Sequence, residues 1–196
     1  MALIFHDVIA EEAVIGVWKI EEDEKEVLSQ HPHLAEIVKN YSRPERRMEK
    51  LSAYLLLYSL QADAQLLIGH NPDGKPLLDG WHISVSDTRG FVAVVLSKTN
   101  SVGIDIEFIS NRVDRIAKRF IRPDEMADNT MKRLLTWSVK EAVYKYCSEE
   151  HLDYFDMRLH PFDLSQNGII EVDNLKNNTS LRVRYIVTSD YVLAYL

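Results

Sequence analysis

Two stretches decide the fold of this chain: Val102-Gly103-Ile104-Asp105-Ile106-Glu107 and Trp137-Ser138-Val139-Lys140-Glu141-Ala142-Val143-Tyr144-Lys145. In the first stretch, apolar residues alternate with Gly103, Asp105 and Glu107, which predicts a strand with both carboxylates on one face. Residues two apart on a strand lie roughly 6.5 Å apart, so both carboxylates can approach one hard cation. Gly103 is expected to leave that face open beside them.

The second stretch is predicted to be a helix with two distinct faces. Its apolar stripe consists of Leu135, Val139, Ala142 and Tyr146. Trp137, Glu141 and Lys145 follow one another at four-residue spacing on a different face. The helix therefore offers a third carboxylate and an ammonium group. Taken separately, each set of charges is explained more simply by a solvated strand face and an exposed ion pair worth about 0.3–0.5 kcal/mol.

Taken together, the two stretches resemble the bipartite signature of the 4'-phosphopantetheinyl transferase superfamily, roughly V-G-I-D, a spacer, then W-S-x-K-E-A-x-x-K. With 196 residues, the chain is similar to the double-length, surfactin-synthetase-activating type rather than to the single-unit holo-acyl-carrier-protein synthases. The resemblance implies an α+β fold, in which a pseudo-twofold pair of similar α/β subdomains forms one pseudo-dimeric monomer. Residues 1–100 would be the coenzyme A side, and residues 101–196 would carry the signature.

The resemblance implies a magnesium-dependent transferase with coenzyme A as the donor. A serine of an apo acyl or peptidyl carrier protein attacks the β-phosphate, 3',5'-ADP leaves, and the carrier becomes holo. Asp105, Glu107 and Glu141 are the implied magnesium ligands. Glu141 and Lys145 are the implied catalytic residues: Lys145 balances charge on the phosphates, and either Glu141 or a metal-bound water accepts the serine proton.

Contacts with coenzyme A are also implied. They are assigned to Arg47, Lys75, Ser84, Ser86, Lys140 and Lys145. Arg47 lies early in a helix predicted to begin at Ser42-Arg43-Pro44-Glu45, with serine as the cap, and to end near Ala62. Ordinary surface charge is the alternative role for Arg47. Lys75 lies in a Gly-Lys-Pro turn, and the two serines lie in a strand predicted for 82–87.

Besides His82, which stands where asparagine is common and is given no role, two features depart from the double-length pattern. Val85 stands where relatives carry a histidine that contacts coenzyme A, and the 32 positions from Asp105 to Trp137 are fewer than usual. These departures support the alternative of a non-catalytic module that binds coenzyme A or a carrier protein. A magnesium-dependent phosphodiesterase that uses the same carboxylates is a third hypothesis, which leaves Trp137-Ser138 and the double-length layout unexplained.

The composition indicates an ordinary soluble protein, with 46% hydrophobic residues, 27% charged residues and a formal net charge of -7. The sequence shows neither a leader nor a long apolar span, so we expect a cytoplasmic protein without membrane contact. Cys147, as the one cysteine, excludes an intramolecular disulfide and is interpreted as structural. The acidic balance argues against nucleic-acid binding.

A locally basic segment lies between the two signature blocks and is predicted to be helical. Its cations are Arg112, Arg115, Lys118, Arg119 and Arg122. Carrier proteins of this family are acidic, so a basic helix would steer them, although a solvated helix face is about equally well supported. Strands are predicted near 13–20, 91–96, 168–172, 181–187 and 191–196.

Overall fold

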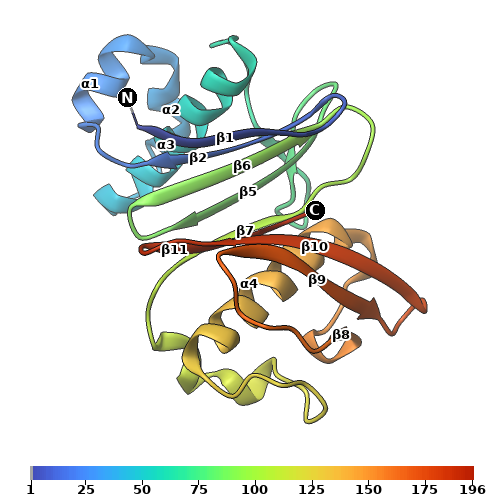
Figure 1. The fold of residues 1–196 in the computed structure, drawn as a ribbon. Coiled ribbons are helices and arrows are strands. Elements are labelled where there is room, and N and C mark those ends of the chain that lie inside the picture. The colour runs from blue at the N-terminus through green and yellow to red at the C-terminus, as the bar shows by residue number, and fades with distance from the viewer. Residues whose placement is uncertain (1) are drawn as a thin grey trace. The chain divides into compact units, whose positions relative to one another are not determined.

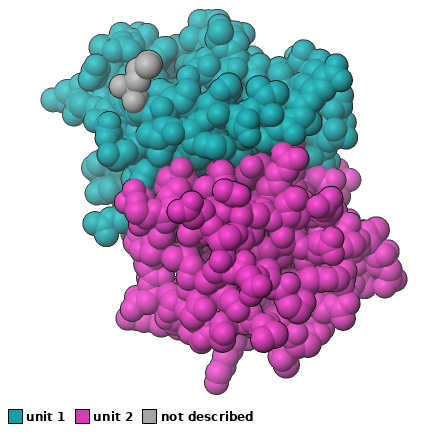
Figure 2. Space-filling model, in the orientation of Figure 1, with its two compact units in different colours: residues 1–101 teal, residues 102–196 magenta. Residues whose placement is uncertain are grey.

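The computed structural model describes residues 2–196, which divide into two compact units (Figures 1 and 2). Unit 1 ends at Ser101, and unit 2 spans Val102–Leu196. Each unit combines antiparallel strands with one long helix, so the predicted mixture of α and β structure is confirmed. A pseudo-twofold relation between the units remains a prediction. Within residues 2–196, no helix has both the length and the apolar character needed to cross a membrane.

Unit 1 is built on a four-stranded antiparallel sheet in the order β1-β2-β6-β5. These strands are β1 Leu3–Ala10, β2 Ala13–Lys19, β5 His82–Thr88 and β6 Phe91–Ser97. A separate small hairpin pairs β3 Gly69–His70 with β4 Pro76–Leu77. The strands predicted near 13–20, 82–87 and 91–96 are therefore confirmed.

Helices cover one face of this sheet (Figure 1). They are α1 Glu24–Gln30, the short 3-10 helix η1 Pro32–Leu34, α2 Ala35–Val38 and α3 Pro44–Gln61. Helix α3 has the predicted length, but Arg43 rather than Ser42 is its N-cap residue. The reason is Pro44: a proline disfavours helical geometry in the residue before it, and Arg43 is accordingly extended, with φ -92° and ψ 124°.

Unit 2 contains a five-stranded antiparallel sheet in the order β7-β11-β10-β9-β8. Its strands are β7 Ile104–Phe108, β8 Met157–Leu159, β9 Asn167–Asn174, β10 Thr179–Val187 and β11 Tyr191–Tyr195. The long helix α4 Thr130–Tyr146 begins with Asn129 as its cap, whose side chain accepts a hydrogen bond from the Lys132 amide. The predicted strands and the predicted signature helix are confirmed.

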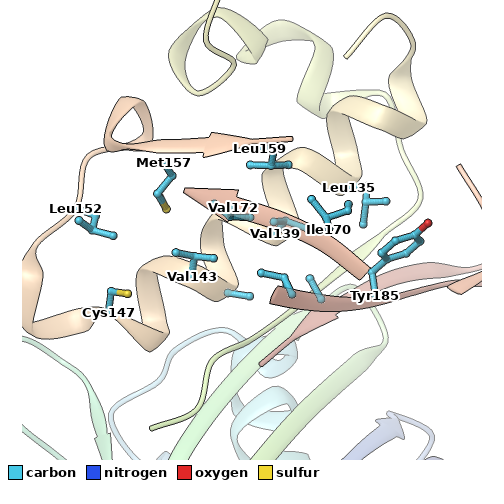
Figure 3. Close-up of a cluster of buried hydrophobic side chains, with 13 residues drawn as sticks. Leu135, Val139, Val143, Cys147, Leu152, Met157, Leu159, Ile170, Val172 and Tyr185 are labelled. Carbon is cyan, nitrogen blue, oxygen red and sulfur yellow. The ribbon is translucent and has the colours of Figure 1, made fainter. Parts of the chain in front are cut away.

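The apolar stripe of α4 supplies the core of unit 2. Figure 3 shows Leu135, Val139 and Val143 facing Ile170 and Val172 of β9, and all five are buried. Burying each such side chain contributes about 1.5–3 kcal/mol, so this contact fixes how the helix is rotated about its axis. The polar face of α4 is thereby directed away from this core.

The basic segment is not the continuous helix that was predicted. It forms two short 3-10 helices, η2 Arg112–Arg115 and η3 Ala117–Arg119, which are separated at Ile116. Packing explains the difference, because Val113 and Phe120 are both drawn into an apolar cluster with Leu134. Two further short 3-10 helices follow α4: η4 Ser148–Glu150 and η5 Tyr154–Asp156.

Candidate active site

The two signature elements, β7 and α4, lie directly against each other within unit 2. A Cβ atom at Gly103 would lie 2.1 Å from the backbone oxygen of Ala142 and 2.9 Å from Cβ of Tyr146. The prediction that Gly103 leaves an open face is therefore wrong, because the backbone of α4 occupies that space. Glycine is required here for close approach of helix and strand, which places the polar side chains of both elements side by side.

Asp105 lies at the centre of this contact and is 4% exposed. The ammonium group of Lys145 donates to Asp105 Oδ1 at 2.9 Å and to the backbone oxygen of Ile104 at 2.9 Å. The Ser138 hydroxyl donates to the backbone oxygen of Asp105 at 3.2 Å. Helix α4 thus holds the strand through both a charged and a neutral side chain, and it places a cation beside the first predicted metal ligand.

The two glutamates are each held by a neutral aromatic donor. Trp137 Nε1 donates to Glu107 Oε1 at 2.8 Å, and the Tyr154 hydroxyl donates to Glu141 Oε1 at 2.5 Å. Burial, together with the nearby charges of Asp105 and Glu141, raises the pKa of Glu107 to about 7. Burial likewise raises the pKa of Glu141, with an additional contribution from Asp105. The three carboxylates therefore lie within electrostatic reach of one another.

The chemistry of this set suits a divalent cation. Among residues 2–196, no three acidic, histidine or cysteine side chains stand in a ready-made metal-binding arrangement. Magnesium does not require one, since it is usually held by one or two carboxylates together with waters and substrate phosphates. Hard oxygen ligands that repel one another in a partly buried site are the donors such a cation stabilises. The residues fit magnesium, and the three-ligand assignment remains a prediction.

Lys140, which was predicted to contact coenzyme A, is held by partners within unit 2. It is fully buried, and its ammonium donates to the backbone oxygen of Phe120 at 2.7 Å, to Glu125 at 2.9 Å and to the backbone oxygen of Tyr154 at 3.1 Å. Glu125 in turn accepts from the amide of Leu159 at 2.8 Å. An ammonium has three donors, so this arrangement favours a structural role for Lys140.

In unit 1, Arg47 is engaged by an acidic partner. Its guanidinium forms a two-pronged ion pair with Glu24 of α1 and donates to the backbone oxygen of Val38 at 3.1 Å. It therefore holds α1 and the end of α2 against α3. Arg46, which we did not single out from the sequence, donates to Asp87 Oδ2 at 2.5 Å. This geometry favours a structural role for Arg47.

The other predicted coenzyme A contacts lie at two places in unit 1. Lys75 lies in the β3–β4 hairpin, where its amide donates to Asn71 Oδ1 at 2.8 Å. Ser84 and Ser86 lie on β5 and are buried. Val85 packs against the apolar core of unit 1, which accounts for an apolar residue at that position. The contacts of Lys75 and the two serines with coenzyme A remain predictions.

Sequence reasoning missed two residues that shape the site. Tyr154 follows Glu141 by 13 positions, and Glu125 precedes Lys140 by 15. Neither belongs to the signature, and neither falls on a periodic stripe with its partner. A buried lysine on the apolar side of α4 was the available signal, since such a residue requires an acidic partner.

The fold and the site together define a mixed α and β protein with a buried acidic cluster where a strand meets a helix. Residues 101–196 match the family model of the 4'-phosphopantetheinyl transferase superfamily. The matched segment includes β7 and α4 with all four residues Asp105, Glu107, Glu141 and Lys145. The match implies a transferase domain, with phosphopantetheine transfer as its general chemistry. No curated protein matches the chain.

Proposed function

We propose that this chain transfers the 4'-phosphopantetheine group from coenzyme A to a serine of an acyl or peptidyl carrier protein. The observation that carries this proposal is the meeting of β7 and α4, where three carboxylates and one ammonium lie inside the segment matched by the family model. The proposal includes a cytoplasmic, monomeric enzyme of the double-length type, with its two units as a pseudo-twofold pair.

In the proposed reaction, the serine oxygen attacks the β-phosphorus of coenzyme A. A serine O–P bond forms, the P–O bond of the pyrophosphate breaks, and 3',5'-ADP leaves. Glu141 is the proposed acceptor of the serine proton, directly or through a water molecule. Tyr154 holds one of its oxygens while the proton is transferred.

Charge on the pyrophosphate must be balanced in such a reaction. Asp105, Glu107 and Glu141 would hold magnesium, which neutralises phosphate charge when it is bound. Lys145, which lies beside Asp105, supplies a fixed positive charge for the leaving group. Lys75, Ser84 and Ser86 remain the proposed coenzyme A contacts, whereas Arg47 and Lys140 are used within the fold.

Intact-mass spectrometry of an apo acyl carrier protein tests this proposal directly. We expect a gain of about 340 Da after incubation with the protein, coenzyme A and magnesium, and none in a magnesium-free control. An apo peptidyl carrier protein provides the second acceptor. The proposal fails if neither class of carrier gains mass under conditions in which the protein is folded.

The non-catalytic alternative, a module that only binds coenzyme A or a carrier protein, rests on Val85 and on the short spacer. Val85 packs in the core of unit 1, so it does not replace the contact that a histidine makes at this position in relatives. Calorimetric binding of coenzyme A without any carrier modification would support this alternative over the transferase.

A further inference from the structure

Two packed aromatic side chains each donate one hydrogen bond to a different glutamate of the acidic cluster. Trp137 donates to Glu107 at 2.8 Å, and Tyr154 donates to Glu141 at 2.5 Å. Their ring centroids lie 5.3 Å apart, with the ring planes inclined at 38°. Because the rings are in contact, the position of one donor depends on the position of the other.

Tyr154 is held in place on several sides. Its ring contacts Phe120 edge-on, with centroids 6.4 Å apart, and its backbone oxygen accepts a hydrogen bond from the buried ammonium of Lys140 at 3.1 Å. The turn that carries it is closed by reciprocal hydrogen bonds between Asp153 and Asp156. Contacts of the ring, the backbone and the turn therefore hold the Tyr154 hydroxyl toward Glu141.

The side chain of Glu141, by contrast, is flexible unless a partner fixes its orientation. A glutamate side chain has three rotatable bonds, and holding it in one orientation costs conformational entropy. A fixed donor at Oε1 selects one orientation of the carboxylate, as hydrogen-bonding partners of metal-binding carboxylates do elsewhere. The same donor satisfies part of the hydrogen-bonding need of a half-buried acid.

We infer that Tyr154 is a positioning residue for Glu141, fixing the carboxylate in the orientation that a divalent cation and the acceptor serine require. The inference rests on the proposed function for its role in transfer. Its effect on metal binding can be measured separately. Losing a hydrogen-bonding partner behind a metal ligand typically weakens metal affinity about 10–100-fold, and we expect a loss in this range.

Isothermal titration calorimetry with Mn2+ in the absence of coenzyme A provides the test. We expect Tyr154→Phe to weaken Mn2+ binding at least about tenfold relative to the unaltered protein. Tyr144→Phe is the matched control, since it removes the hydroxyl of an exposed tyrosine on α4, the helix that carries Glu141, and we expect unchanged affinity. Tyr154→His, which restores a ring N–H donor, should recover part of the loss if Tyr154→Phe is poorly folded.

A double-mutant cycle separates positioning from general damage to the site. In the Glu141→Gln background, Tyr154→Phe should cause no additional loss of Mn2+ affinity, because the carboxylate it positions is absent. An additional loss of the same size would overturn the inference, and so would wild-type affinity in Tyr154→Phe. If the unaltered protein bound no Mn2+, the inference would also fall.

The transfer assay distinguishes failure of this inference from failure of the proposed function. If Mn2+ binding depended on Tyr154 but no carrier protein were modified, the positioning role would be supported and the proposed transfer would be contradicted. Alternatively, the Tyr154→Phe variant could modify the carrier protein with the same metal affinity and the same metal dependence as the unaltered protein. That result would support the proposed transfer and contradict the positioning role of Tyr154.

Discussion

The charged groups on α3 of unit 1 differ from those where β7 meets α4 in unit 2. In unit 1, cations of α3 are paired with acids: Arg47 with Glu24, and Arg46 with Asp87. In unit 2, Asp105 is paired with Lys145, but Glu107 and Glu141 have no cation as a hydrogen-bonding partner in the described structure and are held by neutral aromatic donors. Opposite charges in pairs stabilise a fold without needing a ligand. Carboxylates that lie near one another in a partly buried place are stabilised further when a cation binds beside them.

The largest effect on stability is expected at the Lys140–Glu125 ion pair of unit 2, in which both side chains are buried. In unit 2, Lys140→Met would leave Glu125 buried without its cation, which typically costs about 3–5 kcal/mol. Urea unfolding measures the loss. Glu125→Gln is the matched change on the other side, and the double variant Lys140→Met with Glu125→Leu should recover much of the stability. A double variant as unstable as Lys140→Met would contradict the ion-pair explanation.

The largest effect on activity is expected at Asp105. Asp105→Asn keeps an oxygen that can accept from Lys145 but removes the charge, so we expect transfer to fall at least about 100-fold while the protein stays folded. Intact-mass kinetics with an apo carrier protein measure the rate, and thermal unfolding checks the fold. Transfer at an unchanged rate would remove Asp105 from the proposed metal site.

The two signature stretches show what could and could not be predicted from the sequence. Alternation along 102–107 and four-residue spacing along 137–145 are local properties, so they predict the strand that carries Asp105 and Glu107 and the helix that carries Glu141 and Lys145. That the two elements meet was implied by the family resemblance. The signature also identifies the superfamily that residues 101–196 match. The roles of these residues in binding magnesium do not follow from spacing alone, and those assignments remain predictions.

The contacts that the sequence missed depend on distant parts of the chain. Tyr154 reaches Glu141 because the turn after α4 brings it back, and Lys140 is buried because a loop before α4 supplies Glu125. Gly103 was interpreted as an opening because alternation says nothing of what packs on a face. The structure fills that face with the backbone of α4.

The raised pKa of Glu107 in unit 2 predicts how the stability of the protein depends on pH. Burial raises the pKa of Glu107 from about 4.5 in the unfolded chain to about 7 in the folded protein. Between these values the folded state binds more protons than the unfolded state, so its stability falls as pH rises from 4.5 to 7. Above pH 7 the ionised Glu107 carries a cost of about 1–3 kcal/mol in the metal-free protein.

Glu107→Gln removes that cost and keeps an oxygen that can accept from Trp137. We therefore expect the variant to be more stable than the unaltered protein at pH 8, and about equally stable at pH 4.5, when both are free of metal. Urea unfolding at both pH values measures the difference, with the exposed Glu11→Gln of unit 1 as the control. Equal stability at pH 8 would indicate that Glu107 carries no electrostatic cost.

The smallest effect is expected from a change of Arg47, measured as the affinity for coenzyme A. This change tests whether the paired cations of unit 1 are purely structural. If its guanidinium serves only to hold α1 and α2 against α3, Arg47→Gln should change the dissociation constant for coenzyme A by less than about twofold. A charged hydrogen bond to a phosphate is worth about 1.5–3 kcal/mol, so its loss would weaken binding about tenfold or more. Lys75→Gln, at the β3–β4 hairpin, is the matched change for which we do expect that larger loss, measured by the same calorimetric titration.

A tenfold loss at Arg47 would show that the ion pair with Glu24 exchanges for a phosphate when coenzyme A binds, because one guanidinium cannot satisfy both partners with the same donors. Pairing with an acid would then no longer distinguish the structural charges of unit 1 from those that bind a ligand.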